Sequence, residues 1–368
     1  MIKIDVRRLW LRLTENVDSL LMSFILMLML ISLGLLYSAS GQDLAKTSSQ
    51  MVNMSVALLV MWGVAKVPPQ HLARFALPVY VIGLLLLVGV ALFGDVSHGA
   101  RRWLHIGVTR IQPSEMMKLA VPMMLAWYLD RREKTLNIKD FGVAVLMLVV
   151  PVGLIIKQPD LGTSLLISAA GFYVLFLAGL SWRIILGLVG LGAASAPILW
   201  SLLHDYQRQR ILTLIDPSQD PLGSGYHIIQ STIALGSGGI FGKGWLNGTQ
   251  SHLDFLPERT TDFIFAVYAE EFGLAGNLIL LAVYVLVIGR GLVIAAKAPT
   301  LFSRLLAGSL TLTFFTYAFV NMGMVSGILP VVGVPLPLIS YGGTSMVTLL
   351  LGFGMLMSIQ THRKLVQS

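Results

Sequence analysis

Long apolar stretches alternate with short polar breaks along almost the whole chain. A bilayer core of roughly 30 Å needs about 20 apolar residues per helix, and each stretch is close to that length. The pattern predicts an all-α integral membrane protein, a polytopic bundle of about ten transmembrane helices in one domain over 1–368. The predicted spans lie near residues 18–38, 49–66, 75–94, 113–129, 141–157, 162–179, 183–203, 263–294, 303–329 and 340–358.

Two of these spans need a separate interpretation. The apolar run at 18–38 is longer than the apolar part of a secretory signal peptide, and many spans follow it. We therefore expect an uncleaved first helix, with 1–17 as a cytoplasmic tail. The span at 263–294 is long for one crossing, which indicates a tilted helix or one broken near Gly273 or Gly276.

The basic residues lie mainly in alternate breaks between spans, as the positive-inside rule requires. This asymmetry predicts cytoplasmic N- and C-termini, and it accounts for the net charge of +8 without nucleic-acid binding. Two outer segments, 95–112 and the large extracytoplasmic loop at 204–261, nevertheless carry several cations. An anionic ligand such as a lipid diphosphate would explain them. The alternative for the second loop is that long loops are translocated regardless of charge.

Composition restricts the chemistry further. The chain is 55% hydrophobic and 12% charged, a balance that no water-soluble domain has. It has no cysteine, which excludes disulfides, thiolate catalysis and cysteine-based metal sites. Its 7 histidines show no metal-binding spacing.

A glycine-rich segment, 236–244, superficially resembles a nucleotide-binding loop. A P-loop needs glycine five residues before the Gly-Lys pair and Ser or Thr after it, but Ser237 and Gly244 occupy those places. We interpret it as a flexible loop whose backbone approaches a membrane or sugar ligand.

Several polar residues stand in or beside predicted spans, where they are costly and often functional. Glu115 and Lys118 are three residues apart on one helix face and can form an ion pair. Helix capping would explain Glu115 but not Lys118, so we favour a polar cavity. Asp262 begins the span at 263–294, beside Arg259; alone it fits a capping carboxylate, but its cationic surroundings favour a role at the outer face.

The chain contains a set of specific motifs. They are Arg102-Trp103 with Gln112-Pro113-Ser114-Glu115, then 158–164, Asp216-Pro217 through Gly225-Tyr226, Gly242-Lys243-Gly244, 255–271, 333–337 and Ser340-Tyr341-Gly342-Gly343. With these motifs the chain resembles the SEDS proteins of bacterial cell-wall growth over essentially its whole length. Its short N-terminal tail and the segment 246–251 are similar to the rod-shape type rather than the division type.

The resemblance implies a peptidoglycan glycosyltransferase that polymerises lipid II at the periplasmic face of the cell inner membrane for elongation and rod shape. It implies that Asp262 is the essential acid and that Glu115 and Lys118 line a central cavity. The implied partners are a class B penicillin-binding protein, which is a transpeptidase, and other elongation-complex proteins. It also suggests that a divalent cation, Mg²⁺ or Mn²⁺, can assist, although no ligand cluster in the sequence identifies a metal site.

The chemistry suits these residues. A sugar hydroxyl is a poor nucleophile, so we expect Asp262 to act as general base. The departing diphosphate needs cations, for which Arg102, Arg210, Lys243 and Arg259 are candidates. We expect the polyprenyl tail in a groove between helices.

Two other functions stay open from the sequence. Glu115, Lys118 and Asp160, as charges at membrane depth, would also suit a transporter that flips lipid II, although transporters place their sites near the midplane. A non-catalytic scaffold for the penicillin-binding protein is the third interpretation.

Overall fold

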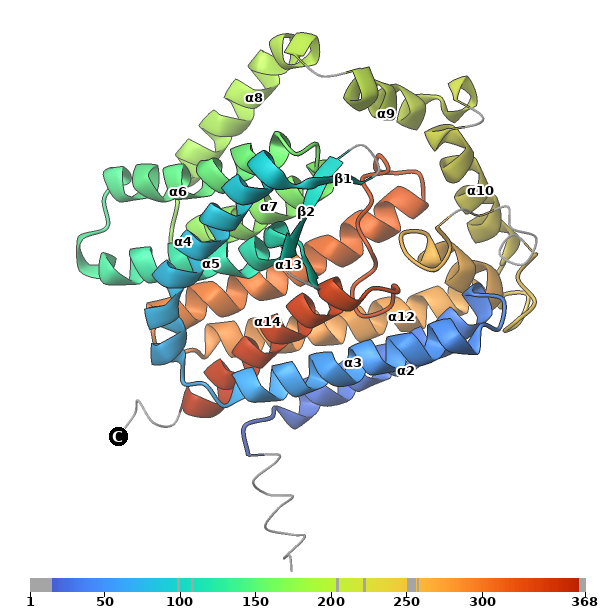
Figure 1. The fold of residues 1–368 in the computed structure, drawn as a ribbon, viewed down its shortest axis with the longest axis horizontal. Helices are drawn as coiled ribbons and strands as arrows, with labels where there is room; N and C mark the ends of the chain where they lie inside the picture. Colours follow the sequence, from blue (N-terminus) through green and yellow to red (C-terminus); the bar gives the residue numbers. More distant parts are fainter. Residues whose placement is uncertain are drawn as a thin grey trace, which may run out of the picture.

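The computed structural model describes residues 15–97, 100–106, 109–202, 205–220, 223–249, 256 and 258–363. These residues form a helical bundle with a small sheet at one end (Figure 1). The helices of the bundle are α2 (Ser19–Ala39), α3 (Leu44–Ala65), α4 (Pro69–Phe93), α5 (Pro113–Arg131), α6 (Ile138–Ile156), α7 (Leu161–Leu177), α8 (Trp182–Leu202), α12 (Ile264–Ala296), α13 (Leu301–Val325) and α14 (Gly343–Thr361). A 3₁₀ turn, Glu133–Thr135, connects α5 to α6.

Each predicted span corresponds to one of these helices, which confirms the all-α membrane class. Within the described residues, 7 helices are long and apolar enough to cross a membrane: α2, α3, α4, α6, α12, α13 and α14. Helices α7 and α8 are apolar but have shorter apolar stretches, and α5 carries Glu115 and Lys118. The number of crossings stays a prediction.

Close packing against α13 and α14 organises the bundle. Helix α13 is buried along most of its length and packs on α12, α7 and α5. Small residues allow the closest approach: a side chain at Gly354 of α14 would lie 2.6 Å from the carbonyl oxygen of Met61 on α3. Helices in a membrane associate through such packing and through interhelical hydrogen bonds. One example joins Ser309 Oγ on α13 to the Ala170 carbonyl oxygen on α7, at 2.7 Å.

A three-stranded antiparallel sheet, which the sequence did not predict, lies between α4 and α5. Its strands, in the order β1-β2-β3, are Asp95–Ser97, Ala100–Ile106 and Thr109–Ile111. The pairing aligns Leu104 with Ile111. We had expected only a loop here. The sheet matters for the site because β2 carries Arg102.

The segment 204–261, expected to be a large loop, contains helices in its described parts. These are α9 (Asp205–Ile215), a 3₁₀ turn at Pro217–Gln219 and α10 (Ser224–Ser237). In Figure 1, α8 and α9 arch away from the bundle and α10 returns to it. Helix α10 then packs against α12 and α13.

Helix α12 is broken at Gly273, which has φ 62° and ψ −161°. The break predicted near Gly273 or Gly276 is therefore confirmed at the first position. Glycine alone adopts this region of backbone conformation without strain. The break separates a short half-helix, residues 264–272, from the rest of α12.

Candidate active site

A polar cavity of about 190 Å³, here called the outer cavity, lies where β2, the starts of α5, α7 and α14, and the segment before α14 meet. Three separate stretches of the chain, 102–118, 160–166 and 333–345, thus contribute to one site. Its lining residues are Arg102, Gln112, Glu115, Lys118, Asp160, Gly162, Thr163, Leu166, Gly333, Val334, Pro335, Thr344 and Ser345.

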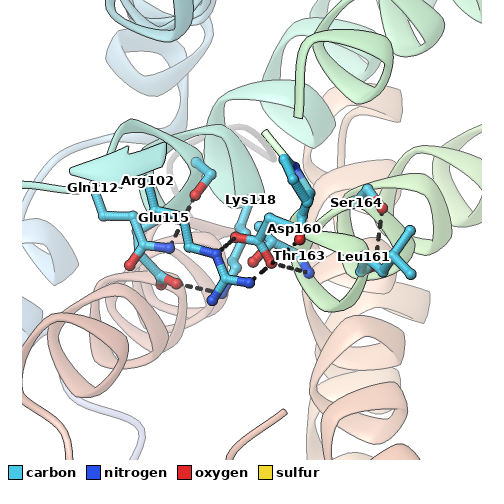
Figure 2. Close-up of polar contacts among 10 residues, drawn as sticks. Arg102, Gln112, Glu115, Lys118, Asp160, Leu161, Thr163 and Ser164 are labelled. Atoms are coloured by element: carbon cyan, nitrogen blue, oxygen red, sulfur yellow. Dashed lines mark hydrogen bonds and ion pairs between the residues drawn. The ribbon is translucent and has the colours of Figure 1, made fainter. Parts of the chain in front are cut away.

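Glu115 and Lys118 form the ion pair that their spacing predicted. Pro113 starts α5, where its missing N–H is harmless, and Glu115 falls in the first helical turn. Lys118 Nζ lies 2.5 Å from Glu115 Oε1, and the two side chains are only 7% and 13% exposed. Lys118 Nζ also lies 5.1 Å from the ring centre of Tyr317. Figure 2 shows the contact between the two side chains, and both residues line the outer cavity.

A second ion pair, between Arg102 and Asp160, lies next to the first (Figure 2). Arg102 Nε lies 3.5 Å from Asp160 Oδ2, and Arg102 Nη2 donates to the Pro159 carbonyl oxygen at 3.4 Å. Asp160 is the N-cap of α7, because its Oδ1 accepts from the Thr163 N–H at 3.3 Å. The helix dipole therefore stabilises the Asp160 carboxylate in place.

Three buried polar atoms around the cavity have no hydrogen-bond partner within the described part of the chain. They are Glu115 Oε2, Arg102 Nε and Asp160 Oδ2. Buried polar groups are rarely left this way, because each costs free energy until it is bonded. Arg102 Nε and Asp160 Oδ2 still face each other in their ion pair, 3.5 Å apart, so Glu115 Oε2 is the atom that can accept a hydrogen bond from a polar ligand.

Asp262 lies in a tightly held turn just before α12. Asn321 Nδ2 on α13 donates to the Asp262 carbonyl oxygen at 2.8 Å, and Ser340 Oγ donates to the Thr261 carbonyl oxygen at 2.6 Å. The Tyr341 N–H donates to the Thr260 carbonyl oxygen at 2.9 Å. Bonds from α13 and from the segment before α14 thus fix the backbone around Asp262.

The Asp262 carboxylate lies beside Gly333, one of the residues that line the outer cavity. A side-chain carbon at Gly333, which lines the cavity, would lie 3.4 Å from Asp262 Oδ2. Burial and the nearby Glu258 carboxylate raise the pKa of Asp262 to about 6, while Arg102 lowers it in part. Near neutral pH the carboxylate is therefore ionised, yet a stronger base than an ordinary aspartate.

The structure brings together most, but not all, of the predicted site residues. Arg102, Glu115, Lys118 and Asp160 line the cavity, and Asp262 borders it. Arg259 is half-buried in the turn that precedes Asp262. Lys243 instead pairs with Glu270 on α12, at 2.7 Å, and the side chain of Arg210 lies outside the described residues.

Asn321 is a site residue that sequence reasoning missed. It is fully buried in α13, and its Nδ2 also donates to the Val334 carbonyl oxygen at 2.7 Å. An amide in an apolar membrane helix is costly without such bonds, so its presence was the signal that could have identified it.

A large apolar groove adjoins the outer cavity. It has a volume of about 770 Å³ and runs between α3, α4, α5 and α14. The groove and the cavity share Gln112, Glu115 and Thr344 as lining residues. A polar cavity that is continuous with an apolar groove can hold an amphiphile, with its head in the one and its tail in the other.

The cavity does not form a metal site from protein groups alone. Across the described residues, no three His, Asp or Glu side chains gather closely enough to hold an ion. We therefore derive no step through Mg²⁺ or Mn²⁺.

The fold and the site define a multi-pass membrane protein with a place for an amphiphilic ligand at one end of its bundle. The chain belongs to the family described as cell cycle proteins that groups FtsW, RodA and SpoVE, which matches residues 16–365.

Individual relatives agree with this assignment. The chain is 54% identical to the peptidoglycan glycosyltransferase MrdB of Escherichia coli K12 over 95% of both chains. It is 38% identical to a probable peptidoglycan glycosyltransferase FtsW of Geobacter metallireducens over 79% of this chain and 78% of that one.

Two solved structures have the same fold. One belongs to a peptidoglycan synthase complex described as coordinating polymerization and crosslinking, with a TM-score of 0.82, 32% identity and coverage of 94% of this chain and 98% of that one. The other is the rod shape determining protein RodA of Thermus thermophilus, with a TM-score of 0.72, 31% identity and coverage of 94% and 97%.

Proposed function

We propose that the chain is a peptidoglycan glycosyltransferase that polymerises lipid II into glycan strands for cell elongation and rod shape, with Asp262 as general base. The observation that carries this proposal is the position of Asp262, a carboxylate held at the wall of a polar cavity that continues into an apolar groove. The relatives named as peptidoglycan glycosyltransferases support the same activity.

In the proposed reaction, a sugar hydroxyl oxygen attacks the anomeric carbon of a second lipid-linked sugar. The hydroxyl proton passes to the Asp262 carboxylate, a new C–O bond forms, and the bond to the diphosphate oxygen breaks. General-base catalysis of this kind typically contributes about 10²- to 10⁴-fold. Because the diphosphate leaves as a stable anion, one carboxylate is enough, unlike in glycosidases.

The two cations of the outer cavity suit the departing diphosphate. Arg102 and Lys118 both line the cavity, and the side chain of Arg102 is 38% exposed. Charge that develops on the diphosphate oxygens would be stabilised by these fixed groups. The guanidinium of Arg102 offers bidentate geometry to phosphate.

The polyprenyl tail would occupy the apolar groove. Apolar side chains such as Val79, Leu119 and Val347 line most of it, and Gln112 and Glu115 are lining residues that it shares with the cavity. This placement keeps the chain of the lipid at membrane depth while its diphosphate reaches Arg102 and Lys118.

The same proposal sets the protein in the cell inner membrane with cytoplasmic N- and C-termini, so that the outer cavity faces the periplasm. The distribution of basic residues supports this orientation. We also propose a class B penicillin-binding protein as partner, together with other elongation-complex proteins, and the likeness to the peptidoglycan synthase complex supports it.

One observation favours a second candidate, a flippase for lipid II. The buried Glu115–Lys118 pair is the kind of intramembrane charge that transporters use. A non-catalytic scaffold for the penicillin-binding protein is the third candidate, and it would need neither charge pair.

Incubation of purified protein with lipid II in detergent separates the three functions, because flipping has no meaning in a micelle. We expect glycan polymer from the natural chain and none from Asp262→Asn. The matched control is Asp43→Asn, an exposed carboxylate that caps α3 through the Ala45 and Lys46 amides, and this variant should polymerise normally. Undiminished polymer from Asp262→Asn would refute the assignment, and absence of polymer from the natural chain would favour a flippase or scaffold.

A further inference from the structure

The glycine-rich loop, residues 238–244, replaces the helical hydrogen bonds that α12 loses at its break. In a continuous helix the N–H groups of Leu274 and Ala275 would bond to the carbonyl oxygens of Glu270 and Glu271. Here the backbone of the loop bonds instead to all four of these groups, the two N–H donors and the two carbonyl oxygens. The loop bonds are Lys243 N–H to Glu270 O (3.0 Å), Gly244 N–H to Glu271 O (2.9 Å), Leu274 N–H to Gly239 O (2.9 Å) and Ala275 N–H to Ile240 O (2.9 Å).

These four bonds require the backbone of the loop to approach the backbone of α12 unusually closely. A side chain at Gly242 would lie 2.1 Å from the Glu271 carbonyl oxygen, and one at Gly273 would lie 2.3 Å from the Gly242 nitrogen. Unpaired backbone groups are costly at membrane depth, so the broken helix depends on the loop.

An ion pair whose carboxylate is fully buried holds the loop in this position. Glu270 is 0% exposed, and its Oε1 accepts from Lys243 Nζ at 2.7 Å. The same oxygen accepts from the Thr249 N–H at 2.9 Å and from Thr249 Oγ1 at 3.0 Å. A buried carboxylate without such partners would cost much free energy, so Glu270 requires the Lys243 ammonium group as its partner.

The pair is linked to Asp262 through a rigid half-helix. Residues 264–271 are all buried. Along the helix axis, Asp262 and Glu270 are roughly two turns apart, about 12 Å. A rotation or shift of this half-helix would move the Asp262 carboxylate relative to the outer cavity. Misplacement by about 1 Å can cost an enzyme about 100-fold in rate.

We propose that Lys243 and Glu270 are positioning residues, whose ion pair locks the glycine-rich loop onto the break in α12 and thereby holds Asp262 at the outer cavity. The inference rests on the proposed role of Asp262 as base. It gives Lys243 a different task from the diphosphate binding that the sequence suggested.

The test compares purified Glu270→Gln, Lys243→Gln and Lys243→Arg with the natural chain in the lipid II polymerisation assay. We expect the two uncharged variants to lower kcat by about 10- to 100-fold with little change in KM, whereas Lys243→Arg retains most activity. A loosened turn also lets water reach Asp262, so its pKa falls toward the ordinary value. The acid limb of the pH–rate profile should therefore move to lower pH.

The matched control is Asp18→Asn, because Asp18 pairs with Arg290 at the other end of the same helix. This variant should lower the thermal unfolding temperature as Glu270→Gln does, yet keep the natural kcat and pH limb. Should Glu270→Gln fail to fold, the two Lys243 variants still decide the question.

Two results would overturn the inference. One is a folded Glu270→Gln or Lys243→Gln variant whose kcat equals that of the natural chain and whose pH–rate profile has its acid limb at the natural pH. The other is a Lys243→Gln variant that raises KM alone, which would return Lys243 to substrate binding. Asp262→Asn is assayed in parallel, since activity in that variant would refute the proposed base rather than the role of the ion pair.

Discussion

Asn321 on α13 donates to the carbonyl oxygens of both Asp262, at 2.8 Å, and Val334, at 2.7 Å. One buried amide thus joins the turn that carries the proposed base to the segment that lines the outer cavity. The two bonds hold the backbone of Asp262 next to the backbone of Val334, which lines the cavity. It makes Asn321 as important for geometry as the charged groups are for chemistry.

Asn321→Leu should impair both stability and turnover. Leucine fills a similar volume but leaves two buried carbonyl groups unpaired, at roughly 1–3 kcal/mol each. We expect a lower unfolding temperature and a kcat reduced by about 10- to 100-fold, because the Asp262 turn loosens. Asn277→Leu on α12 is the control, since Asn277 does not line the outer cavity, and it should polymerise normally. Equal loss of activity in both variants would contradict the prediction.

The pH–rate profile should show an acid limb near pH 6. Asp262 acts as base only when ionised, and burial followed by the Glu258 charge raises its pKa to about 6. As pH falls through that value the carboxylate gains a proton and the rate declines about tenfold per pH unit. Glu258→Gln removes one cause of the raised pKa, so it should shift the limb to lower pH. If the acid limb of Glu258→Gln stayed at the natural pH, the Glu258 charge would not be a cause of the raised pKa of Asp262.

Stability should respond to Asp262 in the opposite sense to activity. A carboxyl group whose pKa is raised in the folded state binds a proton more tightly there, so folding is weakened as pH rises from about 4 to about 6. Asp262→Asn carries no charge and avoids that loss. We expect its thermal unfolding temperature at pH 7 to equal or exceed that of the natural chain, and a clear decrease would show that the ionised carboxylate stabilises the fold.

Lys118 and Glu115 should reveal their roles through a double substitution. Lys118→Met leaves the Glu115 carboxylate buried without its 2.5 Å partner, which costs about 3–5 kcal/mol in comparable buried pairs. The combination Glu115→Gln with Lys118→Met removes both charges and should recover most of that stability. Because the cation is still missing, the double variant should bind lipid II weakly, as a binding titration can measure. Recovery of natural affinity would exclude Lys118 from the diphosphate site.

Backbone geometry at Gly273 can be tested against a second glycine in the same helix. Gly273→Ala combines a φ of 62° with a side-chain carbon 2.3 Å from the Gly242 nitrogen, so we expect a marked drop in unfolding temperature. A carbon at Gly289 would meet nothing within 4 Å, and Gly289→Ala should be neutral or stabilising by about 0.4–1 kcal/mol. Similar unfolding temperatures of the two variants would argue against the need for close contact between the loop and the break in α12.

Patterns within one element were readable from the sequence. Apolar length predicted the helices because a bilayer has a fixed thickness. The excess length of one span indicated a tilted helix or a break near Gly273 or Gly276, of which the structure has the break at Gly273. The spacing of Glu115 and Lys118 predicted their ion pair. Each of these features depends on residues a few positions apart, and the geometry of a helix alone determines which of them are in contact.

Contacts between distant elements were not readable in the same way. Asn321 and Asp262 are 59 residues apart, and Lys243 and Glu270 are 27 apart. The charge of Lys243 suggested a phosphate ligand because nothing in the sequence identifies Glu270 as its partner. The sheet was missed because β1 and β3 have only three residues each, too few to show an alternating pattern.

The apolar groove gives the last prediction, which concerns the length of the lipid. Val347 on α14 lines the groove, and Val347→Trp should fill part of its volume of about 770 Å³. The tail of lipid II would then bind poorly, so KM for the long-chain substrate should rise while a short-chain analogue, whose tail leaves the groove largely empty, is polymerised as before. Leu85→Trp is the control, because Leu85 on α4 is 67% exposed and outside the groove. Equal KM changes for both chain lengths would place the tail elsewhere on the bundle.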